Sequence, residues 1–373
     1  MTLQQEIDEK ARTIHAESYS MSIGELASMY ENNELEIHPE FQRVFRWESA
    51  QRSKFIESIL LGIPIPSIFV AQRDDGVWDV IDGVQRLSTI FEFMGIFRDD
   101  LGNIAPGSQL EETPYLKSLK GKQYENRLDP SNAFTMSQRL YLKRGKIDIK
   151  IIKKESSSDV IYDLFQRINS LGTKLSDQEL RDCAILMVSK DFFKWIKDLS
   201  EYPPFINCLD LSDKDFDEKF NREIASRFFV IQHADLNTIR KQSNFADFIT
   251  DFFVKFWDSS EYDKEQEAII FKQTFDLLNS TLGEESFKKY NISKGKFEGR
   301  FLVSAFEATA IGIAKNLNQW VYSEQTLPEV DQRLREKIIH MWADSAFTAN
   351  IGRGVKFNAR IPAVVEIGQN LFR

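Results

Sequence analysis

The sequence contains little cysteine and little histidine, and this shortage narrows the chemistry that the protein can use. Only Cys183 and Cys208 occur in 373 residues, without C-x-x-C spacing, which argues against a disulfide framework and a cysteine zinc site. The four histidines are widely separated and form no H-E-x-x-H pattern. Walker, G-x-G-x-x-G and G-x-S-x-G motifs are missing too. Carboxylate, amide and guanidinium groups remain as candidates.

Long apolar runs and an excess of positive charge are also absent. No stretch approaches the roughly 18 to 20 uncharged residues of a membrane span, and the polar N-terminus contains no signal-peptide core. We therefore expect a cytoplasmic protein. The net charge of −9 argues against a chain that coats nucleic acid through its overall charge. Any contact with DNA therefore requires a local basic region.

The first half of the chain alternates between helix and strand signals. A capping box at Ser22–Glu25 predicts a helix that runs to about Asn33. A second helix is expected from Ser49 to Gly62, where glycine can adopt the left-handed conformation that ends helices. The Asp-Asp-Gly turn at residues 74–76 lies between apolar residues and predicts a β-hairpin.

These signals predict an α+β protein with a small mixed α/β domain followed by a predominantly helical one. The alternating segment "KIDIKIIKK" at 146–154 predicts a strand that joins the hairpin's sheet, and residues 99–138 read as an irregular insert that could move as a flap. We expect an N-terminal extension over 1–21, the mixed domain over 22–155 and the helical domain over 156–373. Apolar periodicity predicts helices at 222–233, 245–257, 265–278, 301–317, 330–342 and 359–372.

The stretch "VIDGVQRLST", Val80–Thr89, is the first candidate site because polar groups gather where a strand should change to a helix. A strand that ends at Asp82, a flexible Gly83 and a helix with Arg86 in its first turn would direct backbone N–H groups and a guanidinium toward one point, which suits a phosphate. Asp82 could hold Mg²⁺ or orient a water, and Gln85 could position a base or a nucleophile. Alternatively, Asp82 caps the helix and Arg86 only pairs with it.

Two further stretches combine basic and polar residues. In "HPEFQRVFRWE", Arg43 and Arg46 alternate with aromatic residues, a pattern that suits phosphate or base binding. Alternatively, the segment is a strand that lies over the core with its arginines in solvent. In "FQRINSLGTKLSDQEL", Arg167 and Asn169 precede Gly172 between two helices. That loop could converge on an anion, or Gly172 could be an ordinary helix C-cap.

Taken together and in order, four segments resemble the N-terminal domain of GmrSD-type modification-dependent restriction proteins, over roughly Ser22 to Met187. The segments are "FQRVFRW", "KFIESILLGIPIPSIFV", "VIDGVQRLSTI" and "LFQRINSLGTKLSDQEL". The resemblance implies a ParB/sulfiredoxin-like fold and a place in bacterial phage defence. In that family an Asp-Gly-Gln-Gln-Arg motif is linked to nucleotide binding and hydrolysis.

Carried over residue by residue, the resemblance implies a nucleoside triphosphate site with Mg²⁺. It assigns catalysis to Asp82, Gln85 and Arg86, and the metal to Asp82. It assigns nucleotide or phosphate binding to Arg43, Arg46, Gly83, Arg86, Thr89, Arg167 and Asn169. This sequence has Val84 where the family usually has its first glutamine. Loss of a water-positioning amide there would affect hydrolysis more than binding.

The expected function is therefore that of an NTP-binding and NTP-hydrolysing component of a restriction system that acts on DNA. Longer relatives carry a C-terminal HNH nuclease domain, whereas here His233 and His340 lie more than a hundred residues apart, so no HNH site is expected. The helical half would be a scaffold, a DNA-contacting surface or a docking face for a separate nuclease. The alternatives are a non-catalytic, nucleotide-gated DNA-binding module and a ParB-like nickase; the nickase lacks clustered carboxylates beyond Asp82.

Overall fold

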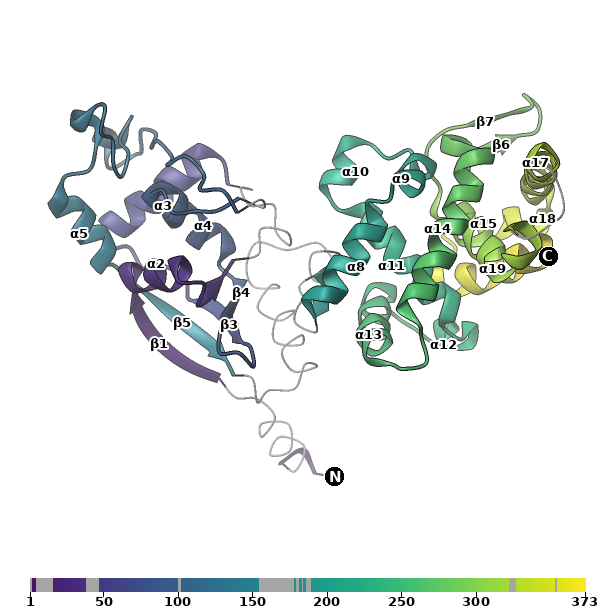
Figure 1. The fold of residues 1–373 in the computed structure, drawn as a ribbon, viewed down its shortest axis with the longest axis horizontal. Helices are drawn as coiled ribbons and strands as arrows, with labels where there is room; N and C mark the ends of the chain where they lie inside the picture. The colour runs from purple at the N-terminus through teal and green to yellow at the C-terminus, as the bar shows by residue number, and fades with distance from the viewer. Residues whose placement is uncertain are drawn as a thin grey trace. The chain divides into compact units, whose positions relative to one another are not determined.

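The computed structural model describes residues 2–4, 16–37, 47–99, 102–153, 178, 181–182, 184–185, 189–321, 327–352 and 354–373. The chain forms two compact units, residues 1–175 and 176–373 (Figure 1). Unit 1 combines a small mixed sheet with helices, and unit 2 is mostly helical. The predicted α+β class, with a helical second half, is confirmed. Within the described residues, no helix is long and apolar enough to cross a membrane.

The sheet of unit 1 has the order β1-β5-β3-β4-β2. The predicted hairpin forms from β3 (Ile68–Gln72) and β4 (Trp78–Asp82), and β5 (Lys146–Ile152) pairs parallel with β3. Strand β2 (Leu35–Glu36) adds to β4. Strand β1 (Ala16–Ser22) pairs antiparallel with β5, although it lies in the segment expected to be an extension. Its sequence, AESYSMS, carries little of the apolar alternation that marks a strand.

Four helices accompany this sheet: α2 (Ile23–Glu31), α3 (Ser49–Leu60), α4 (Val84–Met94) and α5 (Met136–Arg144). The first begins as predicted, because the Ser22 hydroxyl accepts a hydrogen bond from the Glu25 N–H at 3.1 Å. Ile147 and Ile149 of the sheet share one buried core with Leu26, Ile56 and Phe91, which come from α2, α3 and α4. The helices therefore cover one face of the sheet through its buried aliphatic residues.

The insert packs into this core rather than extending as a mobile flap. Its regular structure consists of two short 3₁₀ helices, as its composition predicts. However, Leu110 and Leu119 are buried in the core of unit 1. Glu57 of α3 accepts hydrogen bonds from the N–H groups of Tyr115 at 2.9 Å and Leu116 at 2.8 Å. Although burial acts to raise it, these hydrogen bonds and one from Thr113 lower the pKa of Glu57.

Unit 2 contains twelve described α-helices, one short 3₁₀ helix and one small hairpin. The helices are α8 (Lys190–Ser200), α9 (Pro203–Leu209), α10 (Asp213–Asp217), α11 (Phe220–His233), α12 (Leu236–Arg240), α13 (Phe245–Asp258), α14 (Lys264–Thr281), α15 (Val303–Lys315), α16 (Asn318–Val321), α17 (Leu327–Ala343), α18 (Ser345–Asn350) and α19 (Phe357–Leu371). The hairpin pairs β6 (Lys289–Asn291) with β7 (Lys296–Glu298). All six helices predicted for this half are present.

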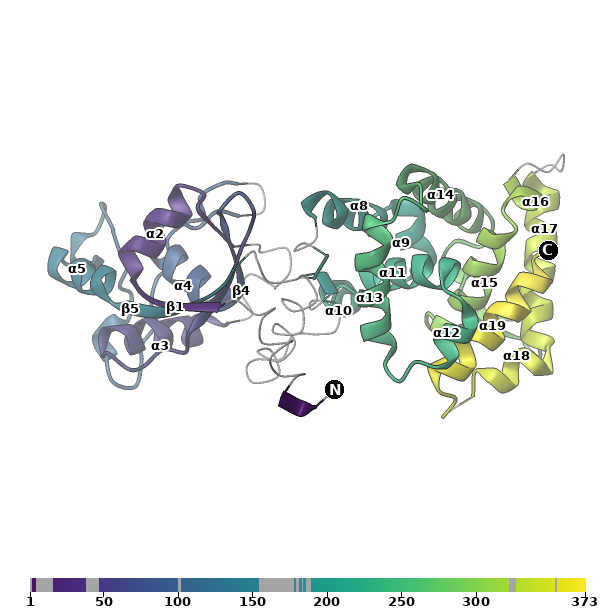
Figure 2. The same cartoon turned by 90° about the horizontal axis from the view of Figure 1, so that it is seen from below.

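Helices α15 and α19 pack side by side in unit 2, as both ribbon views show (Figure 2). Gly368 of α19 makes this close approach possible. A Cβ atom at Gly368 would lie 2.0 Å from the Ala308 carbonyl oxygen, and one at Gly312 would lie 2.6 Å from the Gly368 oxygen. Any larger side chain at either position would push the two backbones apart.

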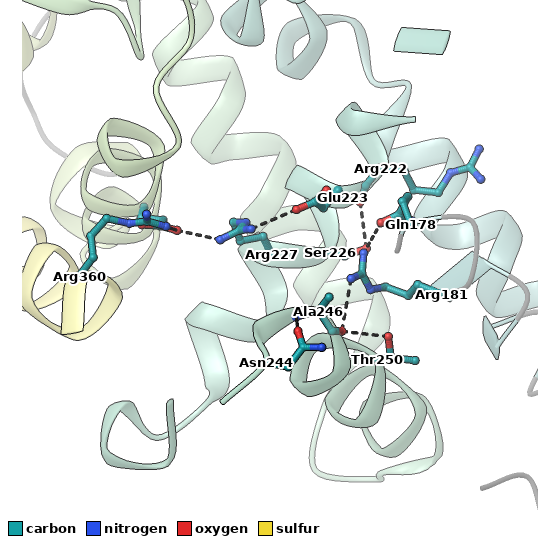
Figure 3. Close-up of polar contacts among 11 residues, drawn as sticks. Gln178, Arg181, Arg222, Glu223, Ser226, Arg227, Asn244, Ala246, Thr250 and Arg360 are labelled. Atoms are coloured by element: carbon teal, nitrogen blue, oxygen red, sulfur yellow. Dashed lines mark hydrogen bonds and ion pairs between the residues drawn. The ribbon is translucent and has the colours of Figure 1, made fainter. Parts of the chain in front are cut away.

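Unit 2 also buries a network of arginines and carboxylates around α11 (Figure 3). Glu307, which is fully buried, accepts hydrogen bonds from Arg227 at 2.9 Å and from Arg360 at 2.9 and 3.0 Å. Arg222 pairs with the fully buried Asp182 at 2.5 Å. Burial raises the pKa of Asp182, against the opposing effect of Arg222. These pairs fix side chains from different helices because an unpaired charge at such depth would be costly.

Candidate functional site

The candidate site lies where β4 ends and α4 begins. Asp82 is the last residue of β4, and Gly83 follows as the N-cap of α4 with a φ of 103°. A Cβ atom at Gly83 would lie 2.7 Å from Cγ1 of Ile68 on the neighbouring strand. Both the backbone conformation and the limited space therefore require glycine at this position.

Arg86 holds the junction together. Its Nη2 donates to Oδ2 of Asp82 at 2.5 Å, and its Nη1 donates to the carbonyl oxygens of Pro66 at 2.5 Å and Ser67 at 2.9 Å. The Arg86 side chain is 12% exposed, whereas that of Asp82 is 40% exposed. The alternative interpretation of the motif correctly expected the pairing of Arg86 with Asp82, but Asp82 is not the cap of α4, because the N-cap is Gly83. Arg86 therefore links the first turn of α4 to the segment that leads into β3.

The remaining side chains of the motif differ in how they face the solvent. Thr89 is 1% exposed, and its hydroxyl donates to the Gln85 carbonyl oxygen at 2.7 Å, so it is used inside the helix. Val84 is also 1% exposed and belongs to the core of unit 1. Gln85 is half-buried. Val84, where the resemblance implies a glutamine, therefore lies in the core and not at the surface of the junction.

The start of α4 is suited to an anion. Its N-cap, Gly83, has no side chain to cap the helix, and its first intrahelical hydrogen bond joins the Leu87 N–H to the Gly83 carbonyl oxygen at 3.0 Å. The N–H groups of the first turn are therefore directed out of the helix end, where the helix dipole also favours negative charge. The half-exposed carboxylate of Asp82 lies beside this end. Phosphate and a cation could thus meet at one junction.

Four other predicted residues cannot be placed at the junction. Arg43, Arg46, Arg167 and Asn169 lie outside the described residues. The structure does bring together the residues of the motif itself, from Asp82 to Arg86. In the described part of the chain, no cluster of three or more His, Cys, Asp or Glu side chains could hold a metal ion.

Comparison with known families supplies the assignment of this region. Residues 23–186 match the model of the GmrSD restriction endonuclease N-terminal domain. Residues 23–186 are a GmrSD-type N-terminal domain. This match supports a place for the chain in a restriction system. No match was found among curated proteins or among solved structures.

The GmrSD-type domain extends beyond unit 1. Its matched segment ends at residue 186, whereas unit 2 begins at residue 176. Two residues of this last part, Arg181 and Asp182, are almost fully buried. Arg181 donates to the Ala246 carbonyl oxygen of α13 at 3.4 Å (Figure 3). The burial of these two charged residues was not predicted from the sequence. Charged residues among apolar ones on a predicted helix were the available signal, although they more often mark a solvated face.

Proposed function

We propose that the chain is the NTP-binding and NTP-hydrolysing part of a restriction system that acts on DNA, with the nucleotide at the junction of β4 and α4. The observation that carries the proposal is the start of α4 at the left-handed Gly83, which has no side chain to cap the helix, beside the half-exposed Asp82 carboxylate. The membership of residues 23–186 in a restriction endonuclease domain family supports it. The proposed target, DNA, follows from that membership.

Each residue of the junction has a distinct part in this proposal. The first-turn N–H groups of α4 bind phosphate oxygens. Asp82 orients a water or holds Mg²⁺, and Gln85 positions the attacking water. Arg86 is a positioning residue, because its hydrogen bonds to Asp82, Pro66 and Ser67 fix the carboxylate and the loop before β3.

The donor set at the junction fits Mg²⁺ that arrives with the nucleotide. Mg²⁺ is usually bound through one or two carboxylates together with substrate phosphates and water, so the single carboxylate of Asp82 is sufficient. Oδ2 of Asp82 is engaged by Arg86, which leaves Oδ1 as the oxygen that would face the ion. When bound, the ion would neutralise negative charge on the transferring phosphate.

The decisive experiment measures phosphate release from each of the four NTPs with Mg²⁺, with and without DNA, for the wild-type protein and Asp82→Asn. Asparagine keeps an oxygen that can accept from Arg86, so the fold should persist while the negative charge is lost. We expect turnover to fall about 100-fold or more. Asp75→Asn is the matched control, because Asp75 also pairs with an arginine, Arg73, at 3.2 Å on the hairpin. Wild-type turnover in Asp82→Asn would refute the assignment.

A second candidate, a non-catalytic nucleotide-gated module, is favoured by the bonds of Arg86. A phosphate that drew Arg86 away from the carbonyl oxygens of Pro66 and Ser67 would release the segment before β3. Binding would then change the structure without any product. This candidate predicts saturable nucleotide binding, no phosphate release, and faster hydrogen exchange at Ser67 when nucleotide is present.

A further inference from the structure

The charge of the chain is distributed unevenly. Residues 113–146 contain eight Lys and Arg residues and two Asp and Glu residues, a net charge of +6, whereas the whole chain carries −9. The other residues together therefore carry −15. This stretch comprises the end of the insert, α5 and the first residue of β5.

Six exposed basic side chains occur in this stretch, which we call the basic end of unit 1. It consists of Lys117, Lys120, Arg127, Lys143, Arg144 and Lys146, all of them exposed. Across the described residues, none of these six takes part in an ion pair. Other basic residues of unit 1 do: Arg52 pairs with Glu92 at 2.5 Å, and Arg73 pairs with Glu36 at 3.2 Å.

The loop and helix that carry these residues are fixed to each other. Arg139 of α5 pairs with Glu125 of the insert, and its guanidinium lies 5.9 Å from the centre of the Tyr124 ring. Lys122 donates to the Ser131 carbonyl oxygen at 2.5 Å, which closes the loop. The basic end is therefore presented on an ordered part of the fold.

The basic end also carries exposed aromatic and apolar groups. Tyr141 of α5 is 56% exposed, Tyr115 is 75% exposed and Leu128 is 99% exposed. Positions 137, 141 and 144 follow helical spacing, so Ser137, Tyr141 and Arg144 lie along one side of α5. A hydroxyl, a phenol and a guanidinium on one helix side are groups that commonly contact phosphate and sugar.

Within unit 1, α5 lies at the opposite end from the β3–β4 hairpin in both ribbon views (Figures 1 and 2). Acidic residues gather around that hairpin: Glu34, Glu36, Asp74, Asp75, Asp79 and Asp82. The α5 end of unit 1 thus carries an excess of positive charge, with Glu111, Glu112 and Asp148 at its margins. Exposed like charges within about one Debye length of roughly 8–10 Å repel one another. Their grouping without acidic partners therefore favours a role in binding a polyanion.

We infer that the basic end is the surface through which unit 1 binds the phosphate backbone of duplex DNA. This inference rests on the part of the proposed function that makes DNA the target. Six exposed positive charges can neutralise phosphates that are spaced about 1.7 Å apart along the axis of the duplex, with release of counterions. Binding through the backbone is independent of sequence, so recognition of the target sequence or modification occurs elsewhere.

The test measures binding of a fluorescein-labelled DNA duplex to the full chain, without nucleotide, over a NaCl series. The first variant is Lys143→Ala with Arg144→Ala. We expect the affinity at about 0.1 M salt to fall about tenfold or more, and the slope of log affinity against log salt to shrink by about two. Equal affinity and slope in this variant and the wild-type protein would overturn the inference, as would undetectable binding by the wild-type protein.

Two further variants separate DNA binding from folding and from overall charge. Lys117→Ala with Lys120→Ala lies outside α5 and should weaken binding similarly, even if the first variant loosens the helix. Lys289→Ala with Lys296→Ala removes the same charge from exposed positions of unit 2 and should leave affinity unchanged. Equal loss in this control would overturn the inference. Displacement of the DNA by polyglutamate at equal charge concentration would also overturn it, in favour of an acidic protein partner.

The nucleotide and DNA proposals fail in distinguishable ways. Asp82→Asn should bind DNA like the wild-type protein, because Asp82 lies outside the basic end. Loss of phosphate release with intact, salt-dependent DNA binding in that variant supports both proposals. If the wild-type protein releases phosphate but does not bind DNA, only the inference about the basic end is overturned.

Discussion

Substitution of Gly83 by alanine should destabilise unit 1 through two separable effects. The left-handed φ of 103° disfavours any residue with a Cβ atom, at a cost of about 1–2 kcal/mol. The new Cβ would also lie 2.7 Å from Cγ1 of Ile68. Overpacking of this kind adds about 1–3 kcal/mol. The total expected loss is about 2–5 kcal/mol.

A double-mutant cycle with Ile68→Ala distinguishes the two effects. Ile68 is fully buried, so its truncation alone should cost about 2–5 kcal/mol. It removes both γ carbons and leaves only the Ile68 Cβ, at 3.3 Å from the new methyl group. In this background Gly83→Ala should cost only the conformational part of about 1–2 kcal/mol. The expected coupling is therefore about 1–3 kcal/mol.

Native-state hydrogen exchange, followed by mass spectrometry on peptides of β3 and α4, is the appropriate assay. It reports the stability of unit 1 separately from that of unit 2, which a single melting curve of a two-unit chain does not. If the effects of the two substitutions add to within about 0.5 kcal/mol, the close approach of Gly83 to Ile68 is refuted. A loss below about 1 kcal/mol for Gly83→Ala would also contradict the left-handed conformation.

The remaining predictions concern buried groups. Val84→Gln, which introduces the glutamine that the resemblance implies, should bury an amide and destabilise unit 1 by about 1–3 kcal/mol without faster phosphate release. Faster turnover would contradict the burial of Val84. Glu307→Ala should cost about 3–5 kcal/mol, because it leaves Arg360 without its carboxylate partner and Arg227 with Glu223 alone. In contrast, Glu366→Ala, from the half-exposed pair with Arg240, should cost less than about 1 kcal/mol in urea unfolding. Burial raises the pKa of Cys208 to about 12, so iodoacetamide at pH 8 should label it only after unfolding; rapid labelling of the folded protein would contradict this. Because the folded-state pKa of this thiol is raised, its contribution to stability should be lost between about pH 9 and 12, as the unfolded thiol ionises first.

Much of the sequence-based interpretation rested on short-range signals such as turns and helix caps. The Asp-Asp-Gly turn predicted the hairpin and placed Asp82 at the end of its second strand, because such turns fix the backbone within a few residues. The Ser22 cap likewise fixed the start of α2. Strand β1 escaped prediction because its partner, β5, lies more than a hundred residues away, and its own residues show little alternation. Long-range pairing of this kind has no local pattern.

The sequence by itself determined the candidate junction: a carboxylate, a left-handed glycine and a helix start follow from the order Asp82, Gly83, Val84 and from the change in apolar spacing. Only the tertiary structure decided what these groups do. It gave Arg86 the carbonyl oxygens of Pro66 and Ser67 as partners and turned Val84 into the core. Periodicity and turn chemistry act over a few residues, whereas burial and hydrogen-bond partners depend on which distant segments pack together. The sequence therefore located the site, and the packing assigned each side chain its surroundings.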